Sequence, residues 1–134
     1  MRRSLLFGLV GLAILSLPQV LLAHGSVVRN YAEVFAEGPN TPVVWSYKYN
    51  TTQVHRRVCV HVTVQKRPGG GGTWAHLESS RKCDRKVSGI KLTNFVSRKC
   101  SKDYRVVGRG VSYGPESGAH LEASDTSNIL QNTC

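Results

Sequence analysis

Histidines are the residues of this chain whose chemistry is easiest to name, because imidazole binds metals and transfers protons near neutral pH. The chain has five of them, and His24 follows Ala23 close to the start. If a peptidase cut before His24, its amino group and imidazole would together chelate Cu(II), and a second histidine would complete a planar set of nitrogens. A cut before Ser26 would abolish this predicted copper site.

Two further histidines form a second candidate site with a carboxylate. If residues 54–65 and 73–79 pair as a hairpin, His76 lies near residue 63 and approaches His61 diagonally, with Glu78 further along the same face. Such a cluster would hold a metal or perform acid-base chemistry, whereas the interpretation we favour is a structural cross-strand group. His24, His61 and His76 are therefore the candidate metal ligands, and no cofactor is predicted.

Nucleophilic catalysis has no recognisable motif in this chain. There is no G-x-S-x-G elbow, and the cysteines are expected to be oxidised. A ribonuclease would need two histidines, or a histidine and a carboxylate, converging beside cationic phosphate binders, and the sequence shows no such convergence. We predict no catalytic residues and keep a basic secreted nuclease or other hydrolase as an alternative.

Positive charge is concentrated in one stretch of the chain. Residues 81–109 hold ten basic residues against Asp84 and Asp103, whereas the rest of the chain after residue 23 holds six basic and six acidic residues. A cluster of this kind attracts polyanions in a salt-dependent way. The residues that we expect to bind anions are Arg81, Lys82, Arg85, Lys86, Lys91, Arg98, Lys99, Lys102, Arg105 and Arg109.

Several anionic partners fit such a cluster. They are a cell-wall polymer, an acidic polysaccharide, lipid head groups or an acidic protein surface. Nucleic acid is less favoured, because only Phe95 and Tyr104 lie among the basic residues as aromatic stacking platforms. The competing interpretation is a solvated basic face that only keeps the protein in solution.

Alternating side chains predict strands that would position these residues. Residues 54–65 place Val54, Val58, Val60, Val62 and Val64 on one face and His55, Arg57, Cys59, His61, Thr63 and Gln65 on the other. Further strands are expected at 26–36, 43–50, 73–79, 87–96, 104–113 and 119–123, with a glycine loop at 69–72. This pattern predicts an all-β fold, a small antiparallel β-sandwich or barrel of about seven strands.

The four cysteines predict two disulfides, because the beginning of the chain indicates export to an oxidising compartment. The hairpin that turns at the glycine loop places Cys59 opposite a residue near position 80, close to Cys83. We therefore expect Cys59 to pair with Cys83 and Cys100 with Cys134, although four cysteines allow three connectivities.

The first 23 residues have the three parts of a secretion signal: basic Arg2 and Arg3, an apolar run at 5–17, and Pro18 before a short neutral tail. This run is shorter than the roughly 20 residues that a membrane-spanning helix needs, and no later stretch comes close. Cleavage before His24 and cleavage before Ser26 both fit. We predict a signal peptide at 1–23 and a single β domain at 24–134, without a transmembrane span, that is secreted or extracytoplasmic.

Taken together, these patterns predict an exported β domain that binds an anionic extracellular or cell-envelope partner without catalysis. The alternatives are a copper protein with an N-terminal histidine ligand and a basic secreted hydrolase. Each makes a different demand on the fold. Anion binding needs the basic side chains to share a face, whereas the other two need histidines to converge.

Overall fold

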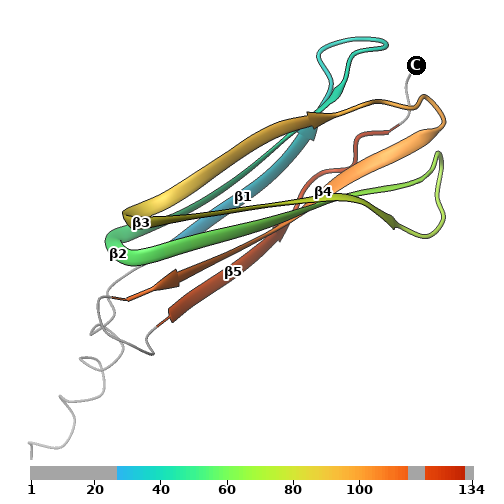
Figure 1. Cartoon of the computed structure of the whole chain (residues 1–134). Coiled ribbons are helices and arrows are strands. Elements are labelled where there is room, and N and C mark those ends of the chain that lie inside the picture. Colours follow the sequence, from blue (N-terminus) through green and yellow to red (C-terminus); the bar gives the residue numbers. More distant parts are fainter. Residues whose placement is uncertain (1–26, 115–119, 132–134) are drawn as a thin grey trace, which may run out of the picture.

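The computed structural model describes residues 27–114 and 120–131, and these residues form antiparallel strands and the turns between them (Figure 1). Every strand pairing is antiparallel, which confirms the all-β prediction. Within the described ranges, no helix is long and apolar enough to cross a membrane. The strands are β1 (Val28–Phe35), β2 (Val43–Pro68), β3 (Ala75–Val96), β4 (Lys102–Tyr113) and β5 (His120–Thr126).

The predicted number of strands is wrong, because the described residues form five strands and not about seven. β2 joins two of the predicted strands, and β3 joins two others. Residues 51–53 of β2 are Thr, Thr and Gln, which lack the glycine or proline that usually ends a strand. A bend replaces the predicted break, and the register of β2 against β3 shifts between Asn50 and His55.

This bend folds the long β2–β3 hairpin back over itself, as the left side of Figure 1 shows. β1 pairs with residues 44–51 of β2, whereas β4 pairs with residues 57–68. The first half of β2 therefore lies in one layer with β1, and the second half lies in the other layer with β4 and β5. The hydroxyl of Thr51 supports the bend, since it lies 2.7 Å from the carbonyl of Gln53 and 2.9 Å from that of Ser88.

The core fills the space between these two layers. Alternate residues of both halves of β2 point inward and are buried, so each half keeps the period of two that a half-buried strand requires. The side chains that β2 contributes to the hydrophobic core are Val43, Trp45, Tyr47, Tyr49, Val58, Val60, Val62 and Val64.

The bend also corrects the predicted faces of two residues. Val54 was expected inside with the other valines and His55 outside, but Val54 is 65% exposed and His55 only 6% exposed. An irregular register at a bend changes which side of the strand each residue occupies. The alternation predicted for the strand therefore holds from Arg57 to Gln65 and fails at its first residues.

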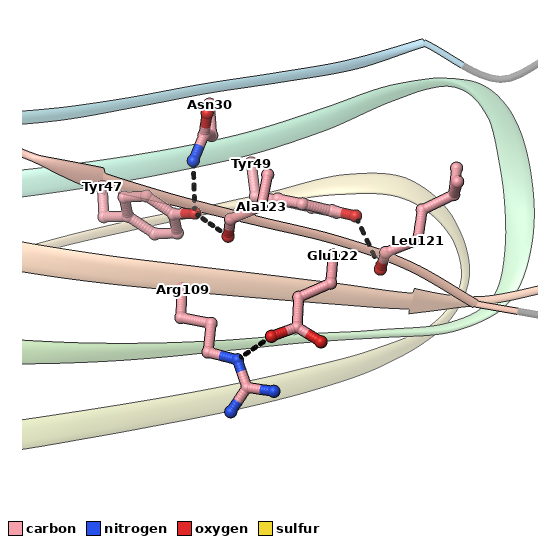
Figure 2. Close-up of polar contacts among 7 residues, drawn as sticks. All are labelled: Asn30, Tyr47, Tyr49, Arg109, Leu121, Glu122 and Ala123. Carbon is pink, nitrogen blue, oxygen red and sulfur yellow. Dashed lines mark hydrogen bonds and ion pairs between the residues drawn. The ribbon is translucent and has the colours of Figure 1, made fainter.

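Two tyrosine hydroxyls connect the layers across the core (Figure 2). The hydroxyl of Tyr47 donates to the carbonyl of Ala123 at 3.4 Å and accepts from the Asn30 amide at 3.2 Å. The hydroxyl of Tyr49 donates to the carbonyl of Leu121 at 3.2 Å. Both carbonyls belong to β5, so these bonds position β5 against the first layer.

Side chains near the end of β5 and just after it also cover the outer edge of β1. Asp125 accepts a hydrogen bond from the backbone N–H of Ala32 at 2.8 Å. Asn128 accepts from the N–H of Val34 at 3.2 Å and donates to its carbonyl at 3.0 Å. These bonds satisfy an edge strand that would otherwise be open to pairing with another chain.

A disulfide joins the two strands of the long hairpin. Cys59 and Cys83 lie directly opposite each other on β2 and β3 and are bonded, as predicted. The glycine loop also lies where it was expected, and Gly70, Gly71 and Gly72 all adopt positive φ angles between the two strands. Cys134 lies outside the described residues, so the pairing of Cys100 with Cys134 stays a prediction.

Burial of Tyr47 makes the stability of the fold sensitive to alkaline pH. Desolvation raises the pKa of Tyr47 from 10.0 to about 12. From pH 10 to 12 the unfolded chain therefore loses this proton before the folded chain does, and stability falls as the pH rises. Denaturant unfolding across this range should show that fall, and Tyr47→Phe should reduce it. If stability fell with pH as steeply in Tyr47→Phe as in the exposed control Tyr113→Phe, the raised pKa of Tyr47 would not be the cause of the fall.

Candidate anion-binding face

The second layer presents five arginines on its outer face, and we call this set the arginine face. Valines 58, 60, 62 and 64 of β2 point into the core, so the alternate residues between them point outward. Residues directly opposite each other in an antiparallel pair share a face, which brings residues of β3 and β4 to the same side. The arginine face consists of Arg57 on β2, Arg81 and Arg85 on β3, and Arg105 and Arg109 on β4.

The register sets these arginines in rows across the strands. Arg57 lies opposite Arg85, and Arg81 and Arg109 lie on either side of His61. The disulfide occupies the row between them, and the guanidinium of Arg57 reaches 3.6 Å from the sulfur of Cys83. Rows of like charge on the outer face of one sheet add their fields and form a positive surface.

Few carboxylates neutralise this face. Glu122 on β5 accepts a hydrogen bond from Arg109 (Figure 2), and this bond lowers the pKa of the Glu122 carboxyl. Within residues 27–114 and 120–131, none of Arg57, Arg81 and Arg85 forms an ion pair with a carboxylate. The face therefore keeps most of its positive charge available to a ligand.

At the end of the face near the glycine loop, two arginines contact Trp74. Arg105 and Arg67 both lie over the ring of Trp74, with guanidinium carbons 4.3 and 4.5 Å from its centroid. Arg67 also pairs at 3.1 Å with Asp103, whose side chain is 2% exposed. These contacts hold Trp74 and two cations together at the edge of the arginine face.

The predicted anion-binding residues do not all share this face. Lys82 pairs with Asp84 at 3.7 Å, and Lys91 lies opposite Lys48 in the other layer. Arg98 donates to the carbonyl of Gly38, in the connection between β1 and β2. Lys86 lies at the bend, and Lys99 and Lys102 lie at the connection between β3 and β4. Residues 81–109 are thus one block in sequence but several sites in space.

Sequence reasoning missed Arg57 and Arg67, because it counted charge by segment. Both belong to β2, outside the stretch that carries the excess charge. The alternation of residues 57–65 does predict that Arg57 lies on the outer side of the strand, with Cys59. Combining that alternation with the Cys59–Cys83 pairing would have added Arg57 to the face.

Two hollows accompany the face, one at the bend and one over the rows of Cys59 and His61. The first has a volume of about 410 Å³ and is lined by Arg56, Arg57, Arg85 and Lys86. The second has a volume of about 340 Å³, and Arg81, Arg109 and His61 contribute to its lining. Both hollows are lined by basic side chains that an anionic group would reach from solvent.

The candidate metal site of His61, His76 and Glu78 is not assembled among the described residues. His61 lies opposite Arg81 and His76 lies opposite Gln65, so about four residues of strand, or roughly 13 Å, separate the two histidines. Glu78 lies opposite Val64, whose side chain points into the core, and His76 contacts Ser79 at 2.8 Å. In the described part of the chain, no three His, Cys, Asp or Glu side chains are grouped to hold a metal ion. His24 lies outside it.

Comparisons with known proteins give no information about the arginine face. No family model matches this chain, and neither a curated protein nor a solved structure does. The function of the chain must therefore be argued from its side chains.

Proposed function

We propose that this protein binds an anionic extracellular polymer along the arginine face, without changing it chemically. The observation that carries the proposal is the gathering of five arginines from three strands on one outer face. Glu122 neutralises one of these arginines, Arg109, by an ion pair. Guanidinium groups suit this role, because their fixed fork of donors matches the oxygens of carboxylate, sulfate and phosphate groups.

The dimensions of the face favour an extended ligand. Neighbouring strands of a sheet lie about 4.8 Å apart, and rows four residues apart along a strand are separated by roughly 13 Å. The arginines therefore cover three strands and several rows, a distance that one small anion cannot span. A polymer with charges at intervals would contact several of them at once and gain affinity from each contact.

The extracellular location that we propose for the protein fits an anionic polymer as its partner. A disulfide is consistent with an extracellular location, where anionic polysaccharides and cell-envelope polymers are exposed. Residues 1–23 would direct export as a signal peptide, and residues 24–134 would form the secreted domain. The copper and hydrolase alternatives gain no support from the described histidines, which do not converge.

Removing charge from the face should weaken polymer binding strongly. We expect Arg81→Gln, Arg105→Gln and Arg109→Gln together to raise the dissociation constant for dextran sulfate roughly 100-fold, at about 1 kcal/mol for each cation at an anionic surface. The dependence of binding on salt should also become shallower, because fewer counterions are released when the polymer binds. Retention on a dextran sulfate column across a salt gradient measures both effects.

The matched control removes the same charge elsewhere. Lys48→Gln, Lys91→Gln and Lys99→Gln change three exposed cations outside the arginine face. If this control weakened retention as much as the arginine variant did, net charge alone would explain binding, and the face would have no special role. Equal retention of the arginine variant and the unmodified protein would also reject the proposal.

A further inference from the structure

The bend of the long hairpin builds a local concentration of cations at one end of the arginine face. Arg56, Arg57, Arg85 and Lys86 line the hollow of about 410 Å³, two from each strand. The lining contains no carboxylate, and none of the four forms an ion pair with a described acidic residue. Four like charges around one hollow repel each other, and an anion placed between them would relieve that repulsion.

The backbone at the hollow departs from regular strand geometry. The register passes from the pair His55 and Val87 to the pair Arg57 and Arg85, and leaves Arg56 and Lys86 out of the ladder. Lys86 has a φ of 54°, a left-handed conformation that residues other than glycine rarely adopt. This geometry brings Arg56 and Lys86 to the same hollow as Arg57 and Arg85, which a regular strand would not do. Such outliers are concentrated at binding sites, where the strain serves the ligand.

The number of cations indicates the charge of the ligand. A carboxylate, a sulfate ester and a phosphodiester each carry one negative charge, whereas a phosphomonoester carries between 1.5 and 2 near pH 7, roughly, and offers three acceptor oxygens. Four cations around one hollow favour the group with the highest charge in a small volume. The hollow is also larger than one phosphate group, which leaves space for the sugar or other unit that carries it.

We propose that the hollow at the bend binds a phosphomonoester group carried by the anionic polymer. This inference rests on the proposed function, since it assigns one group of the same ligand to one end of the arginine face. Arg57 and Arg85 belong to both the face and the hollow, so a polymer whose phosphomonoester lies in the hollow would continue over Arg81 and Arg109.

Methyl phosphate and dimethyl phosphate test the charge requirement, because they share the tetrahedral group and differ in one charge. In a titration followed by backbone amide NMR shifts, methyl phosphate should saturate shifts at residues 56, 57, 85 and 86. Dimethyl phosphate should bind at least about tenfold more weakly, because it lacks the second charge. Equal affinities for the two compounds would overturn the inference.

Variants separate the hollow from the rest of the face. Arg56→Gln with Lys86→Asn removes two cations and keeps a residue that tolerates the left-handed backbone. This pair should abolish methyl phosphate binding, whereas the matched control Arg81→Gln with Arg105→Gln should keep it. Unchanged NMR spectra away from the bend establish that both variants fold. Methyl phosphate binding that survives Arg56→Gln with Lys86→Asn would overturn the assignment.

Polymers distinguish this inference from the proposed function. The hollow variant should lose about tenfold more affinity for phosphorylated dextran than for dextran sulfate, which contacts the rest of the face. If it bound phosphorylated dextran as tightly as the unmodified protein did, a phosphate carried by the polymer would not be the ligand of the hollow. The proposed function would then still stand on the dextran sulfate result, and it would fall only if the arginine variant lost no affinity there.

Discussion

Replacing Gly110 by alanine is expected to lower the free energy of unfolding by about 3 kcal/mol, at the upper end of the cost of overpacking a core. A Cβ at Gly110 would overlap the ring of Tyr49. That ring cannot move aside easily, because it is buried and its hydroxyl contacts Ser112 and the carbonyl of Leu121. The first half of β2 would have to separate from β4.

Chemical denaturation measures this effect, with Gly38→Ala as the matched control. A Cβ at Gly38 would meet nothing nearer than Thr41, at an ordinary contact distance of 3.8 Å. We therefore expect the control to change the free energy of unfolding by less than about 0.5 kcal/mol. If Gly110→Ala cost no more than this control, the two layers would not be packed through Tyr49 as described.

Removing the disulfide is expected to cost about 3 kcal/mol of stability. Cys59 and Cys83 are separated by 24 positions in sequence, and their bond restricts the unfolded chain over the whole of that loop. The bond also joins β2 and β3 in the row next to Arg57 and Arg85. The double variant Cys59→Ala with Cys83→Ala should therefore unfold at a lower denaturant concentration than the unmodified protein.

A neighbouring cross-strand pair provides the control for this variant. Thr63 and Ser79 lie opposite each other on the same two strands, with hydroxyls 3.5 Å apart on the exposed side. Replacing both by alanine should cost less than about 1 kcal/mol, because the contact is weak and solvated. If the cysteine variant cost no more than this control, the strand pairing would hold the hairpin without help from the disulfide.

Local sequence patterns were enough to predict much of the second layer. The alternation of residues 57–65 separates buried valines from outward side chains, since successive residues of a strand point to opposite faces. The glycine loop set where the hairpin turns, and symmetric pairing from that point brought Cys59 close to Cys83. The strand between Lys102 and Tyr113 was likewise placed within two residues of its observed start.

The predicted histidine cluster shows how a small register error defeats a site prediction. His76 was expected near residue 63 but lies opposite Gln65, because the hairpin pairs Thr63 with Ser79, three positions further along β3 than symmetric pairing predicted. The sequence carries no local sign of this offset. A displacement of two residues moves a side chain by about 7 Å along the strand, which is enough to separate potential metal ligands.

Short-range patterns in the amino-acid sequence predict the all-β class, the outward alternation of Arg57 and Cys59 and the pairing of Cys59 with Cys83, because these depend on short periods and one turn. Three outcomes appear only in the folded arrangement: β2 and β3 bend instead of breaking, His55 is buried, and arginines of three strands form one face. Those outcomes depend on which strands become neighbours and on the packing of Tyr47 and Tyr49 against β4 and β5. Such contacts join residues far apart in sequence, so no local pattern contains them.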